Sequence, residues 1–251
     1  MVKNERDNNK ITKQKEEEVG LISFIRTIAF AAILALSIRS ILYEPFHIPS
    51  SSMKPGLLIG DYIFVSKMSY GYGKYSFPLK SFNLFDGRIA QNLPKRGDVA
   101  VFRLPSDDDI NYIKRIIGIP GDIIKVSNGQ LFVNGTAIKK EYKGEFKEDG
   151  IDIAMFEEIL YGKKFKVLDQ YTRSAQDNTP SYKVPNNHYF VMGDNRDNSQ
   201  DSRYQMQVGF IPFDNFIGRA TMIFFSSKYP IWKFWKWPES IRADRIFQRI
   251  K

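Results

Sequence analysis

EPFHIPSSSMKPGLLIGDYIFVSK, residues 44–67, places three consecutive serines directly before the pattern that decides the fold. Its last seven residues, DYIFVSK, alternate apolar and polar side chains and are rich in β-branched and aromatic types, which predicts a half-buried strand. DIIKVSNGQLFVNG (122–135) predicts a hairpin, because Asn128-Gly129 suits a type I′ turn. Further strands are predicted in GDVAVFRL (97–104), KVPNNHYFVMGDN (183–195) and GRATMIFFSS (218–227). The sequence therefore predicts a mainly β protein with many short hairpins.

Three other stretches interrupt this pattern. Residues 70–95 are rich in Gly, Tyr and Ser and predict a long loop, and residues 123–186 are polar with a mixed pattern, which predicts an inserted lobe. Within that lobe, DIAMFEEILYG (152–162) is one short helix candidate. Residues 228–251 hold all three tryptophans between lysines, which suits a bilayer interface. The alternative for them is an ordinary strand that ends in a basic helix.

Upstream of the serines lies the one long apolar stretch, LISFIRTIAFAAILALSIRSILY (21–43). Its uncharged part, 27–38, is short for a bilayer span of about 20 residues. Arg26 and Arg39 would lie near the two interfaces, however, and their side chains would reach the headgroups. We therefore expect an uncleaved transmembrane anchor. A cleaved signal peptide is the alternative, since Ala35-Leu36-Ser37 offers small residues for cleavage.

The distribution of basic residues predicts the orientation of this anchor. Residues 1–20 contain several lysines and an arginine, whereas no Lys or Arg occurs between Arg39 and Lys54. Because basic residues favour the cytoplasmic side, the tail is expected in the cytoplasm and the rest of the chain across the membrane.

Composition excludes several classes of protein. Hydrophobic residues make up 43% of the 251 residues, so disorder throughout is excluded. The net charge of +9 permits attraction to anionic lipid, and no nucleic-acid-binding signature accompanies it. Cysteine is absent, which excludes disulfides and thiolate metal sites. His47 and His188 are the only histidines, so a Ser-His-Asp triad would have to use one of them.

The serines themselves permit two interpretations. Ser51 and Lys54 form an S-x-x-K motif, which penicillin-recognising acyl-transferases use at a helix start. Lys54 precedes Pro55, however, and a residue before proline avoids the helical region; the companion S-D-N and K-T-G motifs are also absent. Taken alone, the serines favour a polar turn after the anchor.

Four ordered blocks change that interpretation. They are IPSSSMKPGLLIGDYIFVSK (48–67), KRGDVAVFRLP (95–105), YIKRIIGIPGD (112–122) and VMGDNRDNSQDSR (191–203). Together with the anchor, they resemble the bacterial type I signal peptidases, membrane-bound serine endopeptidases that remove signal peptides from exported preproteins. The resemblance covers roughly residues 40–225 and is weak over 123–186. It implies an N-terminal transmembrane helix followed by a β-rich catalytic domain of coiled antiparallel sheets with an inserted lobe.

The chain is therefore expected to have six parts. They are a cytoplasmic tail (1–20), a transmembrane anchor (21–43), the first part of a catalytic core (44–122), an inserted variable lobe (123–186), the second part of the core (187–227) and a basic aromatic C-terminal segment (228–251).

By this resemblance Ser52 is the nucleophile and Lys114 is its general base, a variant of the triad that needs no histidine. A lysine base must be neutral, and burial among apolar groups lowers its pKa from the ordinary value of about 10.4. Ile113, Ile116 and Ile117 would supply that surface. Arg115 is expected to alternate outward and to add some like-charge repulsion.

The resemblance also assigns supporting roles. The Ser50 hydroxyl would help the Ser52 N–H to form an oxyanion hole, and Ser51 stands where many members carry glycine. Counted from Asp194, the block GDNRDNSQDSR has Arg196 at the third position of a calcium loop and lacks the central glycine, so no metal is expected. The resemblance assigns the remaining positioning roles as follows: Ser199 bonds the Lys114 amine, Asp201 and Arg203 form an ion pair, and Gly193 and Asp194 hold the turn.

The substrate is expected to be a preprotein signal peptide with small residues before the cut, in the pattern Ala-x-Ala. Phe46, Ile48, Tyr112 and Ile113 would line its pockets, and the peptide would add a strand at the site. No cofactor and no nucleic-acid partner are expected. The lipid bilayer is expected to be a partner. The resemblance implies a single-pass protein of the bacterial inner membrane with its catalytic domain outside the cytoplasm. The alternatives are another Ser-Lys peptidase and a non-enzymatic, membrane-anchored β-domain that binds partners.

Overall fold

The structure is a computed structural model that describes residues 20, 22–34, 36–37, 39, 42–76, 87–148, 150–170, 174–230 and 232–251. It contains two compact units, residues 1–42 and 43–251. In the first unit residues 22–34 are helical. Within the described residues, no helix combines the length and the apolar character needed to cross a membrane. Parts of the predicted tail and anchor lie outside the described residues, so the span over 21–43 stays a prediction.

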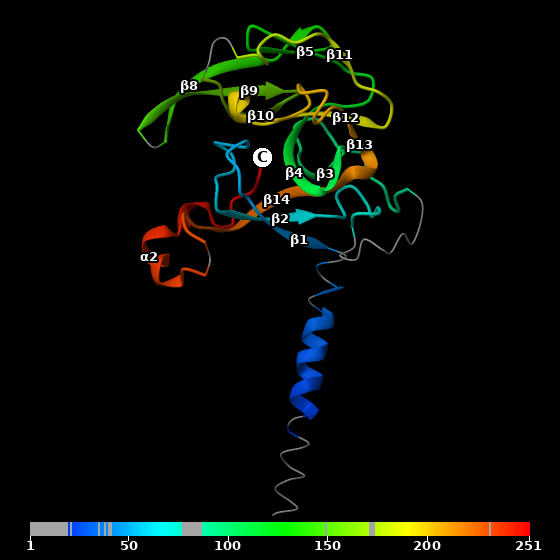
Figure 1. Cartoon of the computed structure of the whole chain (residues 1–251), viewed down its shortest axis with the longest axis vertical. Coiled ribbons are helices and arrows are strands. Elements are labelled where there is room, and N and C mark those ends of the chain that lie inside the picture. Colours follow the sequence, from blue (N-terminus) through cyan, green and yellow to red (C-terminus); the bar gives the residue numbers. More distant parts are fainter. Residues whose placement is uncertain are drawn as a thin grey trace, which may run out of the picture. The chain divides into compact units, whose positions relative to one another are not determined.

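The second unit is built on an antiparallel sheet of seven strands, which confirms the mainly β prediction (Figure 1). The strand order is β1-β2-β14-β3-β4-β12-β13. The strands are β1 (Tyr43–His47), β2 (Asp61–Ser66), β3 (Val99–Leu104), β4 (Asp107–Gly118), β12 (His188–Met192), β13 (Ile211–Pro212) and β14 (Phe216–Ser226). β14 comes near the end of the chain but lies between β2 and β3, so it joins the two early parts of the sheet.

Residues 123–186 form two smaller sheets, which Figure 1 shows above β1, β2 and β14. One contains β5 (Ile123–Ser127), β6 (Gln130–Val133), β7 (Thr136–Ala137) and β11 (Tyr182–Lys183). The other contains β8 (Lys139–Glu148), β9 (Ile151–Leu160) and β10 (Lys163–Leu168). Asn128 and Gly129 both have positive φ between β5 and β6, as the predicted hairpin turn requires.

The predicted helix at 152–162 is wrong, because these residues form most of β9. β9 is the central strand of its sheet and pairs with β8 on one side and β10 on the other. Hydrogen bonding to two neighbours outweighs the weak helical preference of its Ala, Met, Glu and Leu residues. Glu158 and Leu160, two residues apart, are both buried, which is the period of a strand.

The C-terminal segment is neither an ordinary strand nor one long basic helix. It contains the short helices η3 (Phe234–Lys236), α2 (Trp237–Ser240) and η4 (Ala243–Arg245). Beyond η4 the chain returns to β14, where Ile223 N donates to Gln248 O at 2.9 Å and Ile250 N donates to Thr221 O at 2.9 Å. Two further 3-10 turns lie elsewhere in the described residues, η1 (Arg196–Asn198) and η2 (Phe213–Asn215).

Gly218 tests how closely β14 packs against β2. A Cβ atom added there would lie 2.4 Å from the backbone oxygen of Ser66. We expect Gly218→Ala to lower the free energy of unfolding by about 1–3 kcal/mol, since neither backbone can give way easily. Chemical unfolding followed by tryptophan fluorescence measures the change. Gly56→Ala is the control, because its nearest atoms lie at 3.4 and 3.5 Å; equal unfolding midpoints for the two variants would contradict this account of the sheet.

Candidate active site

The three serines lie in the turn that follows β1. Ile48, Met53 and Leu57 are buried on either side of them and anchor this turn in the core. Backbone bonds fix its shape: Lys54 N donates to Ser51 O at 3.0 Å and Leu57 N donates to Met53 O at 2.9 Å. Lys54 does not act as a helical partner of the serines, because its buried amine forms an ion pair with Glu148.

β4 brings Lys114 to this turn from 62 residues further along the chain. Lys114 Nζ donates to Ser52 Oγ at 2.8 Å. Both side chains are nearly inaccessible, with 4% of Lys114 and 7% of Ser52 exposed. The predicted nucleophile and base are therefore in contact in a largely dry environment.

Burial also sets the protonation of this amine. It lowers the pKa of Lys114 from the ordinary 10.5 to about 8, although Asp201 and Asp194 act against it by favouring the charged form. The amine donates a second bond to Ile113 O at 3.1 Å and lies 5.0 Å from the centre of the Tyr112 ring. With this pKa, about a tenth of the Lys114 amines are neutral at pH 7 and about half at pH 8, and only the neutral form can accept a proton.

Arg115 corrects one expectation. It does not point outward, because residues 113–118 of β4 are all buried and only 3% of Arg115 is exposed. Its guanidinium binds Asp194 through Nε at 2.8 Å and Nη2 at 2.6 Å, and it lies over the ring of Phe165 on β10. Arg115 therefore holds the turn at Asp194 from inside the protein. The prediction of an outward-facing Arg115 that repels the charge of Lys114 is wrong.

The turn after β12 is organised by Asp201. This fully buried carboxylate accepts bonds from Gly193 N at 2.9 Å and from Arg203 Nε at 2.8 Å. Burial raises the pKa of Asp201, but Arg203 and the Gly193 N–H outweigh burial and hold it below its ordinary value. The predicted Asp201–Arg203 ion pair is present, and the carboxylate stays charged beside Lys114.

Ser199 does not make its predicted bond. Its Oγ is buried and has no hydrogen-bond partner among the described residues, Lys114 included. It packs instead against Gly193: a Cβ there would lie 2.1 Å from Ser199 Oγ and 2.5 Å from Ser52 O. Because Gly193 has no side chain, Ser199 Oγ and Ser52 O can both approach its backbone. Packing against Gly193, and not a hydrogen bond, therefore fixes the position of Ser199. Ser50 Oγ lies 3.3 Å from Ser52 Oγ, which is close enough for the oxyanion role predicted for the Ser50 hydroxyl.

Two asparagines of the block GDNRDNSQDSR were not recognised in the sequence. Asn198 Nδ2 donates to Ser51 Oγ at 2.8 Å, and Asn195 Nδ2 donates to Ser51 O at 3.2 Å. Asn195 N also donates to Ser52 O at 3.1 Å. These bonds explain Ser51, which the sequence left unassigned: its hydroxyl and carbonyl tie the serine turn to the turn after β12.

The sheet β8–β10 also supports the site, which the sequence did not predict. Glu158 on β9 is buried and binds Arg196 through both guanidinium ends, at 2.6 and 2.5 Å. Glu148 at the end of β8 pairs with Lys54 beside the serines. The helix predicted at 152–162 gave no reason to expect Glu148 or Glu158 near the serines. Only the acidic character of the segment could have indicated these contacts.

A cleft of about 510 Å³ opens onto Ser52 and Lys114, within the usual size of a ligand pocket. All four residues predicted to bind substrate line it: Phe46, Ile48, Tyr112 and Ile113. Gln200 was not predicted, although it accepts a bond from Tyr112 Oη at 3.1 Å and lines the same cleft. A cleft lined by apolar side chains together with polar groups is suited to an extended peptide with small side chains.

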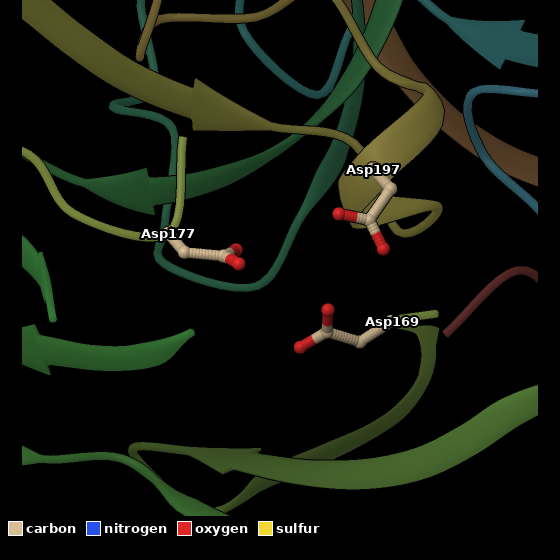
Figure 2. Close-up of side chains that lie close together, drawn as sticks. All are labelled: Asp169, Asp177 and Asp197. Atoms are coloured by element: carbon tan, nitrogen blue, oxygen red, sulfur yellow. The ribbon is translucent and has the colours of Figure 1, made fainter. Parts of the chain in front are cut away.

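Three carboxylates away from the cleft could be considered for a metal. Figure 2 shows Asp169, Asp177 and Asp197 turned toward one another, with ligand atoms within 4.8 Å. Protein groups already occupy them, however: the Lys140 amine binds Asp169, the Ser174 N–H binds Asp177 at 2.7 Å, and the Gln170 N–H binds Asp197 at 2.6 Å. The cluster by itself does not assign a metal site.

Comparison with known proteins gives the same family from the sequence. Residues 21–225 match the family described as "Signal peptidase, peptidase S26". A signal peptidase I of Rickettsia typhi is 39% identical over 265 aligned positions, which cover 98% of this chain and 97% of the relative. That of Rickettsia akari is 40% identical and covers 88% and 90%. A crystal structure of a signal peptidase I from Enterococcus faecalis V583 aligns at 25% identity over 52% of this chain and 98% of that chain, with a TM-score of 0.32.

The protonation of Lys114 can be measured directly. We expect its amine to titrate near pH 8, because burial disfavours the ammonium, and to be mostly neutral above that pH. NMR of protein carrying ¹³C at the lysine ε-carbon would record the titration, with Lys114→Met identifying the signal. Lys143 is the control, since its bonds to Glu141 raise its pKa above the ordinary value. A Lys114 signal that titrates together with Lys143 would contradict the lowered pKa.

Proposed function

The chain belongs to the signal peptidase, peptidase S26 family, whose members are serine endopeptidases that cleave signal peptides, and we propose that it does so with Ser52 as nucleophile and Lys114 as general base. One observation carries the proposal: the Lys114 amine donates to Ser52 Oγ at 2.8 Å at the edge of an apolar cleft. No other amine is within hydrogen-bonding distance of Ser52 Oγ among the described residues. Family membership excludes the non-enzymatic alternative.

In the first half of the reaction, neutral Lys114 takes the Ser52 proton while Ser52 Oγ attacks the carbonyl carbon of the residue before the cut. The charge on the carbonyl oxygen is stabilised by the Ser52 N–H and the Ser50 hydroxyl. A single donor of this kind contributes about 3 kcal/mol in comparable sites. Lys114, now charged, gives its proton to the leaving amine as the peptide bond breaks.

In the second half, a water molecule attacks the acyl-enzyme. Lys114 takes a proton from this water and returns it to Ser52 Oγ as the ester bond breaks, which restores the starting state. A lysine with a pKa of about 8 can act in both directions near neutral pH. An arginine could not, because it keeps its proton throughout this range.

The surrounding ion pairs position these groups. Asp201 is a buried negative charge bound to Gly193 and Arg203, and it would favour the protonated form of Lys114 after Lys114 has taken a proton. Asp194, held by Arg115, would fix the turn that carries Gly193. Ser199 has no bond to the amine in this structure, so its proposed role is to shape the space behind it.

The substrate is a preprotein signal peptide, and the cleft suggests how it binds. Phe46, Ile48, Tyr112 and Ile113 all line the cleft, and this largely apolar lining suits small side chains at the two positions that flank x in Ala-x-Ala. β1 is the edge strand of the large sheet, with unpaired backbone groups on one side. We infer that the peptide binds in extended form and adds to the sheet through its backbone.

We propose that this activity takes place at the surface of a lipid bilayer, which the catalytic unit contacts. The half-exposed face of β1, β2 and β14 carries a series of touching rings, in which Phe64 lies 6.0 Å from Tyr43 and 4.3 Å from Phe224. Beyond β14, Trp232, Phe234 and Trp235 are 62–67% exposed. Aromatic side chains at this density suit a membrane interface. The predicted anchor and tail would then place the catalytic unit at the outer face of a bacterial inner membrane.

Single substitutions test the dyad. We expect Ser52→Ala, Lys114→Ala and Lys114→Arg each to lower kcat by about 10⁴-fold or more, because each removes the nucleophile or the proton acceptor. Ser50→Ala should lower kcat by about 10²–10³-fold, the loss of one oxyanion donor. The assay follows cleavage of a purified preprotein with an Ala-x-Ala site, and Lys143→Ala, an exposed lysine, is the control. Cleavage at the control rate by Ser52→Ala or Lys114→Ala would refute the proposed dyad.

Tryptophan fluorescence tests the membrane contact. In lipid nanodiscs that contain brominated phospholipid, we expect the fluorescence of the chain to be quenched, because Trp232 and Trp235 would lie among the headgroups. Replacing Trp232, Phe234 and Trp235 by serine should remove most of the quenching. Tyr161→Ser, an exposed aromatic on the turn before β10, is the control and should change nothing. Unquenched fluorescence in the unaltered chain would rule out this contact.

A further inference from the structure

A second cavity, of about 770 Å³, lies apart from the cleft. It is bounded by β14, by the first residues of β10 and by the C-terminal residues that return to β14. Its lining residues are Tyr43, Phe64, 97–99, 163–164, 219–222 and 249–251. None of them belongs to the proposed dyad, oxyanion hole or substrate pockets, so the established activity does not explain this cavity.

Positive charge dominates the lining. It contains Lys163, Lys164, Arg219, Arg249 and Lys251, but Asp98 is its only carboxylate side chain. Asp98 is buried and binds the Lys163 amine at 2.7 Å, with Arg219 at 3.9 Å. Lys164 and Arg249 are exposed and have no carboxylate at ion-pair distance among the described residues. The cavity therefore has more positive charge than its own acidic group neutralises.

The rest of the lining is apolar. Val99, Ala220, Met222 and Ile250 form the walls. Tyr43 and Phe64 line one side, and Phe64 stacks on Phe224, so this side continues into the aromatic face described above. A fully hydrated anion would gain nothing from such walls, whereas a molecule with an anionic head and an apolar body would contact both kinds of surface.

We propose that this cavity binds the headgroup of an anionic phospholipid. The phosphodiester would lie among Lys164, Arg219 and Arg249, and the glycerol and the first acyl carbons would lie along Met222 toward Phe64. The proposal rests on the bilayer contact of the proposed function. Tyr43 supports this choice of ligand, because it is the last residue of the segment predicted to cross the membrane, and the chain would then bring this side of the cavity to the lipid surface.

Native mass spectrometry of the full chain in neutral detergent tests the proposal by counting bound molecules. The probes are phosphatidylglycerol, phosphatidylcholine and inorganic phosphate at equal concentration and ionic strength. We expect one phosphatidylglycerol to bind about tenfold more tightly than phosphatidylcholine, since only the former carries a net negative charge. Inorganic phosphate should bind at least as weakly as phosphatidylcholine. Equal binding of the two lipids, or phosphate binding as tight as that of phosphatidylglycerol, would overturn the proposal.

Two variants of equal net charge separate this cavity from general attraction to a basic protein. Lys164→Gln, Arg219→Gln and Arg249→Gln together should abolish the preference for phosphatidylglycerol. Lys139→Gln, Lys143→Gln and Lys147→Gln, all on β8, should preserve it. An equal loss in both variants would show that diffuse charge causes the binding. Both should cleave the Ala-x-Ala preprotein in detergent, so failure of cleavage in the unaltered chain would count against the proposed function and not against lipid binding.

Discussion

The arrangement around the cleft depends on the burial of one amine, that of Lys114. An ammonium group strongly resists burial, and Lys114 meets this constraint by becoming partly neutral, with a pKa of about 8. Every other strongly buried cation near the site has a carboxylate partner among the described residues: Arg115 has Asp194, Arg196 has Glu158 and Arg203 has Asp201. Lys114 has a serine hydroxyl instead. This difference between the paired cations and Lys114 supports the proposed role of Lys114 as the base.

These ion pairs also explain why residues distant in sequence belong to one site. Two of the pairs join other elements to the turn after β12, β4 through Arg115 and β9 through Glu158, and the third, Asp201–Arg203, lies within the turn. A buried charge that loses its partner is costly, by about 3–5 kcal/mol, so the elements cannot separate without penalty. The lobe between the two parts of the core is therefore part of the support of the site.

The sequence predicted what short patterns can encode. Alternation predicted the strands β2 and β3, and Asn128-Gly129 predicted the β5–β6 hairpin. The four ordered blocks paired Ser52 with Lys114 through the family resemblance before any geometry was known. It failed where tertiary contacts decide. Arg115 is buried because β10 covers the second face of β4, and residues 152–162 form a strand because two neighbours pair with them. β10 is far from β4 in the sequence, so no local window over β4 reveals it. β8 and β10 directly precede and follow β9, but the hairpin turns at Gly150 and Gly162 were not recognised in the sequence. The packing of Ser199 on Gly193 depends on a backbone approach that no residue pattern records.

The position of β14 has a consequence for the timing of activity. The turn that carries Ser52 leads into β2, Lys114 lies on β4, and β14 is the strand that joins β2 to the β3–β4 pair. Residues 216–226 are made late in synthesis, so a nascent chain can hold both reactive side chains without the sheet that aligns them. The sheet that aligns Ser52 with Lys114 therefore cannot be complete until residues 216–226 have been made, which is when nearly the whole polypeptide exists.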